Sequence, residues 1–276
     1  MAREENMGDV RAPVVGRPLL EVSGLTKRFG GVEALADYHL RLDRGELLGL
    51  IGPNGAGKTT VFNLLTGVSR PSAGRIAFDG RDITGRAAHR FAAFGIARTF
   101  QNVRLFRDLS VLENVMAGLH RRHGSGLWPT LLGLPSFRQA EREIRDRGRD
   151  LLARLGLEAF AGLRAADLAY GDQRRVEIAR ALATEPVLLL LDEPAAGMNA
   201  QETAALVEMI SGIHRDLGLT VILVEHDMKL VMRLCRRIQV INRGEVLALG
   251  SPREVQNDPA VIDAYLGSRR RQPVHA

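Results

Sequence analysis

The stretch from Gly52 to Thr60 constrains the fold of this chain more than any other part of the sequence. It reads Gly-Pro-Asn-Gly-Ala-Gly-Lys-Thr-Thr, the pattern of a glycine-rich phosphate-binding loop. An apolar, strand-like run at 47–51 leads into it, and a helical pattern that begins at Lys58 leads out. Strand, loop and helix in this order are what a P-loop requires, so the context argues against a glycine-rich turn that binds nothing.

Each residue type in this loop has a physical task. Glycines let the backbone curl until successive N–H groups point inward, and the helix behind them adds the positive end of its dipole. Lys58 is placed to reach the β- and γ-phosphates of a nucleotide, and the Thr59 hydroxyl is placed to bind Mg²⁺. The predicted nucleotide-binding residues of the loop are Gly52, Pro53, Asn54, Gly55, Ala56, Gly57, Lys58, Thr59 and Thr60.

Two adjacent carboxylates follow a second apolar run. Residues 187–191 read as a buried strand, and Asp192-Glu193-Pro194 come directly after it. By itself such a run more often ends in a solvated turn, but together with the P-loop it predicts a Walker B element. Asp192 is then expected on the Mg²⁺ side. Glu193 is expected to be the catalytic base that polarises a water molecule, a role worth roughly 10²–10⁴-fold in rate.

Composition narrows the class of protein but not its partner. With 276 residues, 45% hydrophobic and 25% charged, the chain can bury the core of one large α/β domain, alone or with a subdomain. Its net charge of +6 suits anionic lipid head groups, nucleic acid or no particular partner. The single cysteine, Cys235, excludes an intrachain disulfide and is expected to be a buried, inert thiol on a helix.

No targeting or membrane-spanning segment is apparent in the sequence. Residues 1–18 mix acids, bases and prolines without an apolar stretch, and are expected to be a flexible lead-in rather than a secretory signal. The longest apolar runs have the length of a strand, whereas a membrane helix needs about 20 residues. We therefore expect this chain to work at a membrane only through partners.

Local patterns predict a helical insert inside a P-loop α/β core. Short strands separated by turns are expected over 19–42, with a turn at Gly30-Gly31. Helical spacing dominates 111–155, with glycine and proline interruptions between 124 and 135. The other predicted elements are a strand at 75–78, a short helix before Phe94, helices over 172–183 and 201–217, a strand over 220–224, a hairpin over 238–249 that turns at Arg243-Gly244, and two short helices around 253–255 and 259–266.

The segment Leu-Ala-Tyr-Gly-Asp-Gln-Arg-Arg-Val, from Leu168 to Val176, lies between the P-loop and the Walker B carboxylates. In this place it resembles the signature sequence of the ATPase subunits of ABC transporters, and the resemblance covers about Leu19 to Leu266. It implies an α/β fold: a P-loop NTPase core of the ABC ATPase type with an N-terminal antiparallel β-subdomain and an inserted α-helical subdomain. The implied boundaries are 19–266 for the ATPase domain, about 102–184 for the helical subdomain, about 251–266 for the C-terminal helices and 267–276 for a flexible tail.

The signature departs from the family pattern at two positions. Ala169 stands where the family usually has a serine, and Tyr170 stands where it has a second glycine. Without the serine hydroxyl, one hydrogen bond to the γ-phosphate is missing, so the Gly171 N–H and the helix dipole must contribute more. By resemblance, Ala169, Gly171 and Asp172 contact an ATP molecule held by the P-loop of a second subunit. These departures leave a catalytically weak or purely regulatory protein as an alternative.

Other positions match the family by their place between these motifs. Gln101 resembles the Q-loop residue that contacts Mg²⁺ and the attacking water, and His226 resembles the switch histidine that contacts the γ-phosphate. Phe29 resembles the aromatic residue that stacks on adenine, with a role in the core as the alternative. Asn199 occupies the place of the D-loop residue, where aspartate is commoner. The resemblance thus implies an ATPase that uses ATP and Mg²⁺, with catalytic residues Glu193, His226, Gln101 and Lys58 and Mg²⁺ contacts from Thr59, Gln101 and Asp192.

The separation of P-loop and signature implies a dimer. Both motifs lie on one chain but cannot close over the same nucleotide, so two chains are expected to meet head to tail with ATP at both seams. The second subunit is either the same chain or a paralogue. Binding of Mg-ATP is expected to close the dimer, Glu193 and His226 to support attack of water on the γ-phosphate, and hydrolysis to let the dimer open.

A narrower resemblance implies the cargo. The segments at 95–106, 168–171, 193–199, 225–232 and 264–267 together look like the ATPase subunit of bacterial branched-chain amino-acid importers. Importers of urea or short amides, and ATPases that extract lipopolysaccharide, share much of this pattern. The insert at 118–138 argues against the lipid exporter, and Trp128 within it suits either loop packing or a partner contact.

The importer resemblance implies several partners. They are transmembrane permease subunits, a second ATPase subunit and, indirectly, a periplasmic or extracellular binding protein. The chain is then expected at the cytoplasmic face of the inner or plasma membrane, held there by its partners. No nucleic-acid partner is expected, because the chain has neither the two ATPase units of translation-factor relatives nor the long coiled-coil arms of repair ATPases. A soluble ATPase associated with nucleic acid and a regulator without turnover remain the alternative classes.

Overall fold

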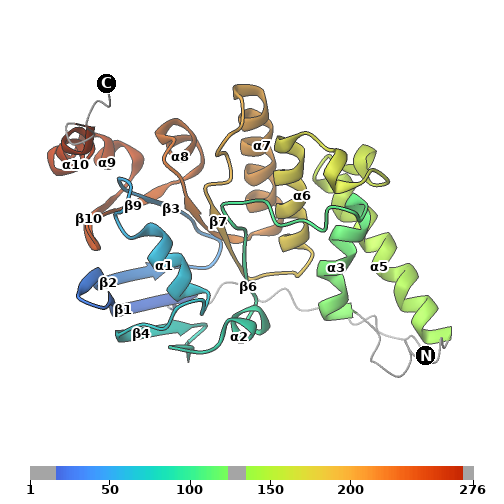
Figure 1. The fold of residues 1–276 in the computed structure, drawn as a ribbon, viewed down its shortest axis with the longest axis horizontal. Coiled ribbons are helices and arrows are strands. Elements are labelled where there is room, and N and C mark those ends of the chain that lie inside the picture. Colours follow the sequence, from blue (N-terminus) through green and yellow to red (C-terminus); the bar gives the residue numbers. More distant parts are fainter. Residues whose placement is uncertain (1–16, 124–134, 270–276) are drawn as a thin grey trace, which may run out of the picture.

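A central α/β core carries the fold, with an antiparallel sheet on one side and a group of helices at one end (Figure 1). The structure is a computed structural model that describes residues 17–123 and 135–269. The predicted fold class is confirmed: a P-loop core with an antiparallel subdomain and an inserted helical subdomain. Most of the expected lead-in and tail, and Trp128, lie outside the described residues.

The larger sheet has six strands in the order β10-β9-β3-β8-β7-β6. In chain order they are β3 (Leu47–Ile51), β6 (Ile96–Arg98), β7 (Leu188–Asp192), β8 (Thr220–Val224), β9 (Arg237–Asn242) and β10 (Glu245–Gly250). Neighbouring strands pair in parallel except for β10, which is antiparallel at the edge. Because the carboxyl ends of parallel strands meet at one edge of a sheet, the loops that leave β3, β7 and β8 lie together there.

Side chains of the central strands divide between two cores. Every residue of β3, β7 and β8 is buried, as expected for parallel strands covered on both faces. Successive side chains point to opposite faces, so Leu48 and Leu50 join the core that contains α1 (Lys58–Leu65). The alternate residues join the core that contains α7 (Ala200–Leu217) and α8 (Met228–Leu234). Burial on both faces explains why these strands read as continuous apolar runs in the sequence.

The N-terminal strands form an antiparallel sheet in the order β2-β1-β4-β5. They are β1 (Leu20–Phe29), β2 (Val32–Leu42), β4 (Ala73–Phe78) and β5 (Arg81–Asp82), followed by α2 (Ala88–Ala93). β1 and β2 join at the predicted Gly30-Gly31 turn and are longer than the short strands predicted. Register shifts interrupt their ladder, and each shift breaks the alternation of apolar and polar residues that marks a strand in sequence.

The helices predicted between 102 and 184 lie side by side at one end of the molecule (Figure 1). They are α3 (Val111–His123), α5 (Pro135–Arg154), the 3₁₀ turns η1 (Glu158–Phe160) and η2 (Ala165–Asp167), and α6 (Tyr170–Leu182). α3 packs against both α5 and α6, and Val115, Ile144 and Val176 are buried there. Two further helices, α9 (Pro252–Asn257) and α10 (Pro259–Arg269), follow the larger sheet. In the two described ranges, no helix combines the length and apolar character needed to cross a membrane.

Further local features differ from the sequence prediction. β6 is absent from the prediction because a strand of three residues is too short to show a period. Cys235 directly follows α8 instead of lying in a helix; it is buried as predicted, and burial raises the pKa of its thiol to about 12. α10 continues to Arg269, past the tail boundary predicted at 267.

Candidate nucleotide-binding site

The P-loop has a conformation that depends on its glycines. Gly57, directly before α1, has a φ angle of +110°, which residues with a side chain rarely adopt. At Gly52 a Cβ atom would lie 2.1 Å from the carbonyl oxygen of Ile241 on β9, so no larger residue fits. Within the described residues, α1 starts with no side-chain cap and no acidic residue in its first turn. The N–H groups at its N-terminus therefore suit a bound anion.

Lys58 is buried against the loop itself. Its Nζ donates to the carbonyl oxygens of Gly52 at 2.6 Å and Pro53 at 3.1 Å. Burial lowers the pKa of Lys58, and the nearby carboxylates of Glu193 and Asp192 act in the opposite sense. A partly desolvated ammonium group gains from an anionic ligand, so the loop fits the phosphates of ATP.

A turn from the far end of the chain supports the P-loop. It is the Arg243-Gly244 turn between β9 and β10, where the Gly244 N–H donates to the carbonyl oxygen of Ala56 at 2.8 Å. The Gly244 carbonyl accepts from the Ala36 N–H at 2.9 Å. The sequence predicts this turn, but its contact with the P-loop follows from the fold alone.

A cleft of about 1170 Å³ opens beside the P-loop. Its lining consists of Val32, Glu33, Ala34, residues 52–60, Gln101, Glu193, His226, Arg243 and Tyr265. Phe29 does not line it: the residue is 51% exposed, with the Nζ of Lys27 4.7 Å from the ring centroid. Phe29 pairs with Val32 across the hairpin and so lies next to the cleft, and its stacking on adenine stays a prediction.

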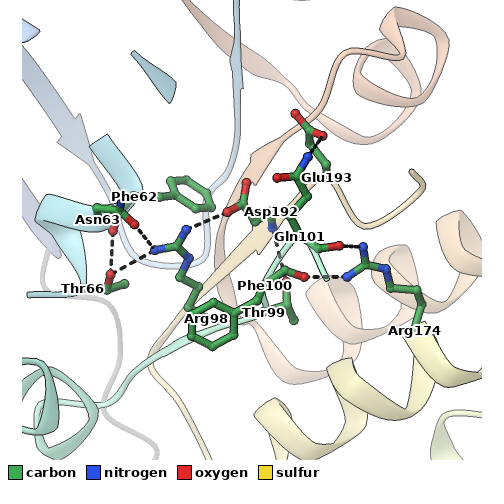
Figure 2. A network of polar contacts seen from close by, with 10 residues as sticks. All are labelled: Phe62, Asn63, Thr66, Arg98, Thr99, Phe100, Gln101, Arg174, Asp192 and Glu193. Atoms are coloured by element: carbon green, nitrogen blue, oxygen red, sulfur yellow. Dashed lines mark hydrogen bonds and ion pairs between the residues drawn. The ribbon is translucent and has the colours of Figure 1, made fainter. Parts of the chain in front are cut away.

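Two loops converge on the side chain of Glu193. Its backbone has a φ angle of +45°, a strained conformation for a residue other than glycine, and its N–H donates to the carbonyl oxygen of Val224 on β8 at 2.9 Å. The Nε2 of Gln101 donates to the Oε2 of Glu193 at 3.2 Å (Figure 2). The Nδ1 of His226 lies 4.0 Å from the same oxygen. A carboxylate oxygen between an amide and an imidazole can hold a water molecule and accept its proton.

Asp192 is more deeply buried than Glu193. Its Oδ2 pairs with the Nη2 of Arg98 at 2.7 Å, and its backbone N–H donates to the Oγ1 of Thr99 at 3.2 Å (Figure 2). Thr59, predicted to share Mg²⁺ with Asp192, lines the cleft at the start of α1. The described residues contain no cluster of three or more His, Cys, Asp or Glu side chains suited to a metal. Mg²⁺ held through a carboxylate, substrate phosphates and waters needs no such cluster, so the residues present fit it.

A buried arginine of α6 holds the backbone around Gln101. The Nη1 of Arg174 donates to the carbonyl oxygen of Phe100 at 2.6 Å, and its Nη2 donates to that of Gln101 (Figure 2). Arg174 also pairs with Glu177 at 3.1 Å, which opposes the rise in the pKa of Glu177 that burial causes. The Q-loop backbone is therefore attached to the helix that follows the signature.

The signature residues lie at the start of α6, away from the cleft. Ala169 is the residue before the helix, and Gly171 and Asp172 are in its first turn, where Asp172 pairs with Arg175 at 3.1 Å. None of the three lines the cleft beside the P-loop. Tyr170 is 43% exposed, and a Cβ atom on Gly197 would lie 3.4 Å from its ring, so it rests against the D-loop of its own chain. One chain thus brings the P-loop, Gln101, Glu193 and His226 together, but not the signature.

Glu225 and Tyr265 are among the residues of the site that were not predicted from the sequence. Glu225 is buried, and its two carboxylate oxygens accept the N–H groups of Ala195 at 2.8 Å and His226 at 3.2 Å, so it joins the loops after β7 and β8. Burial raises the pKa of Glu225, partly offset by those two hydrogen bonds. Tyr265 of α10 lines the cleft, and burial raises its pKa to about 12. In the sequence, Glu225 is marked only as an acid at the end of an apolar strand. The same pattern also fits a solvated turn.

Comparisons with known proteins agree with this geometry. The sequence profile of the family described as ABC transporter matches residues 35–196, and that described as branched-chain amino acid ATP-binding cassette transporter matches residues 245–270. The high-affinity branched-chain amino acid transport ATP-binding protein LivG of Salmonella typhimurium is 49% identical, over 92% of this chain and 99% of LivG. The protein BraF of Pseudomonas aeruginosa, described in the same words, is 47% identical over the same shares.

Solved structures of the same kind are similar in fold. A nucleotide-free ATP-binding cassette from an ABC transporter has a TM-score of 0.78 and 28% identity, covering 90% of this chain and 99% of that one. A dimeric cassette in a post-hydrolysis state with ADP and phosphate has a TM-score of 0.71 and 26% identity, covering 84% and 98%. The chain therefore belongs to the ABC transporter family of ATP-binding proteins, in its branched-chain amino acid branch.

Proposed function

We propose that this chain is an ATP-hydrolysing subunit of a membrane importer for branched-chain amino acids. The observation that carries the proposal is the meeting of Gln101, Glu193 and His226 in the cleft that Lys58 and the P-loop line. Membership of the ABC transporter family makes the chain an ATPase. The cargo rests on the relatives LivG and BraF, which are named for branched-chain amino acid transport.

ATP is proposed to bind with its phosphates in the P-loop. Backbone N–H groups of the P-loop surround them, and Lys58 moves from the loop carbonyls to the β- and γ-phosphates. Thr59, Asp192 and Gln101 would hold Mg²⁺, which when bound neutralises charge on the phosphates. Phe29 is proposed to move onto the adenine from its place beside the cleft.

The chain's own residues carry the hydrolysis step. A water molecule held by Glu193 and Gln101 attacks the γ-phosphorus, and the Oε2 of Glu193 takes its proton. The bond from the γ-phosphorus to the bridging oxygen breaks, which leaves ADP and inorganic phosphate. His226 is placed to hydrogen-bond a γ-phosphate oxygen from the other side of Glu193.

A second ATPase subunit is proposed to complete each site. This is supported by the place of Ala169, Gly171 and Asp172 outside the cleft of their own chain, and by the start of α6, where the described residues provide no side-chain cap. The uncapped N–H groups would face the γ-phosphate of the opposite chain, where Ala169 offers no hydroxyl. Transmembrane permease subunits, and through them an external binding protein, are proposed to use the closing of the dimer for transport at the cytoplasmic membrane face.

Substitution of the proposed base tests the chemistry. In Glu193→Gln we expect ATP hydrolysis to fall by about 10²–10⁴-fold, because the amide cannot accept the proton. The affinity for ATP, measured by calorimetry, should stay close to that of the original chain. Glu143→Gln, at an exposed position on α5, is the matched control. Undiminished phosphate release from Glu193→Gln would refute the assignment of the base.

Recovery of partners tests the transport function. The tagged chain, captured from mildly solubilised membranes, should bring multi-span permease subunits and a second ATPase subunit. Leucine, isoleucine or valine, supplied with the binding protein, should then stimulate ATP hydrolysis by the reconstituted complex. Recovery of nucleic acid or ribosomal proteins, with nothing from the membrane, would leave the ATPase chemistry intact and overturn the transport proposal.

A further inference from the structure

Arg98 connects three elements below the proposed nucleotide site. It is the last residue of β6, and its side chain is 8% exposed. The Nη2 pairs with the Oδ2 of Asp192 on β7 at 2.7 Å. The Nη1 donates to the Oδ1 of Asn63 on α1 at 2.7 Å and to the Oγ1 of Thr66, directly after α1, at 3.3 Å (Figure 2).

The surroundings of Arg98 make this pairing strong and specific. The guanidinium carbon lies 5.5 Å from the ring centroid of Phe62 and 5.3 Å from that of Phe100, so water has little access (Figure 2). Among the described residues, Asp192 is the acid recorded as an ion-pair partner of Arg98. Separating a buried ion pair has a high cost in free energy, because it leaves each charge without a partner. Arg98 and Asp192 therefore hold each other in place. The planar guanidinium also fixes the directions of its hydrogen bonds, which a lysine ammonium would not.

The contacts of Arg98 link two of the residues that are proposed to hold Mg²⁺. Asn63 lies four residues after Thr59 on α1, so both side chains are on the same face of that helix. Arg98 therefore ties Asp192 to the helix that carries Thr59. It also occupies Oδ2 of Asp192, whereas the other carboxylate oxygen has no hydrogen-bond partner among the described residues. The hydrogen bond between Thr99 and the Asp192 N–H holds β6 and β7 in the same register.

We propose that Arg98 is a positioning residue that aligns the Asp192 carboxylate with Thr59 for Mg²⁺-bound nucleotide. The inference rests on the proposed function, since it takes Asp192 and Thr59 as the residues toward Mg²⁺. A role in packing alone would make Arg98 important for folding without any specific effect of Mg²⁺. The two roles differ in how the affinity for nucleotide responds to the metal.

The test compares nucleotide binding with and without Mg²⁺. A fluorescent ATP analogue is titrated into Arg98→Met, once in excess Mg²⁺ and once in EDTA. Loss of a residue that orients a metal ligand typically weakens metal affinity by about 10–100-fold. We call the dissociation constant in EDTA divided by that in Mg²⁺ the Mg²⁺ effect. In Arg98→Met we expect the Mg²⁺ effect to fall at least tenfold, with little change of the dissociation constant in EDTA. Arg98→Lys should fall in between, because it keeps the charge but not the fork of donors.

A matched control and a double variant separate positioning from packing. Arg237→Met removes a partly buried arginine that pairs with Glu46 at 2.7 Å, outside the cleft lining, and should keep the full Mg²⁺ effect. In an Asp192→Asn background, Arg98→Met should cause no further loss, because Arg98 acts through Asp192. The Asp192→Asn background also removes the carboxylate that Arg98→Met would leave unpaired. The double variant can therefore be measured if Arg98→Met alone does not fold.

Two outcomes would overturn the inference in different ways. In the first, Arg98→Met folds and keeps the full Mg²⁺ effect, whereas Asp192→Asn loses it. This result would overturn the role of Arg98 and leave the proposed function standing. An Asp192→Asn variant that keeps the full Mg²⁺ effect would overturn the Mg²⁺ role of Asp192, and the inference about Arg98 with it.

Discussion

At the scale of single residues, the proposed active site depends on carboxylates that the fold has placed in very different surroundings. Glu193 is strained and lies at the cleft, Asp192 is buried in an ion pair, and Glu225 is buried with both oxygens accepting backbone N–H groups. Glu225 thereby fixes the distance between the loop of the proposed base and that of His226. The same burial should make the protein's stability depend on pH.

Glu225 should lower the stability of the protein as pH rises. Its pKa is raised from the usual 4.5, so the folded chain holds this proton more tightly than the unfolded chain. Stability should then fall as pH rises from 4.5 to the raised pKa and change no further above it, with a slope of at most about 1.4 kcal/mol per pH unit. Urea unfolding at several pH values should show this component lost in Glu225→Gln. Equal pH dependence in the two proteins would contradict it, and Glu143→Gln controls for the loss of one carboxylate.

At the scale of elements, the sheet and its helices tolerate added atoms very differently. In β3, a Cβ atom on Gly49 would lie 2.9 Å from the Cγ1 of Val231 and 3.1 Å from the Sγ of Cys235, where α8 packs on the sheet. In α7, the nearest atom to a Cβ on Gly212 is the Oδ2 of Asp216 at 4.0 Å. The strand therefore approaches its neighbours closely at Gly49, whereas the helix has room at Gly212.

Two alanine substitutions should therefore have opposite effects on the free energy of unfolding. Gly49→Ala should destabilise the protein by about 1–3 kcal/mol, because the core must yield to the new methyl group. Gly212→Ala should stabilise it by about 0.5–1 kcal/mol, because alanine loses less backbone freedom in a helix. Urea unfolding at neutral pH measures both. A stabilising Gly49→Ala would mean that α8 can move away from β3.

At the scale of the whole molecule, Cys235 reports on opening of the core between β3 and α8. With a pKa raised to about 12 by burial, its thiolate fraction at pH 8 is about 10⁻⁴. Maleimide should thus label no cysteine in the folded chain and one in the unfolded chain, as seen by mass spectrometry. Nucleotide should slow labelling further, because ligands bind the folded state. Rapid labelling of the folded protein would contradict the burial.

Dimer formation should require both the P-loop of one chain and the signature of the other. In the presence of Mg-ATP, Glu193→Gln should migrate at twice the monomer mass in size-exclusion chromatography, since ATP stays unhydrolysed at the seams. Adding Ala169→Asp to this variant should return it to the monomer, because a carboxylate directly before α6 would repel the γ-phosphate. A double variant that still dimerises would remove the signature from the proposed interface.

The sequence by itself determined the P-loop strand and helix, the buried strands β7 and β8, the hairpin at Arg243-Gly244 and the family. These are local patterns, since periodicity, glycines and capping act over a few residues. Only the tertiary structure decided which side chains meet. Gln101 reaches Glu193 across 92 residues and Arg98 reaches Asp192 across 94. The burial that strengthens the pair of Arg98 and Asp192 exists only after the sheet has formed. Gly244 supports Ala56 for the same reason: contact between distant segments depends on strand order, which no local pattern contains.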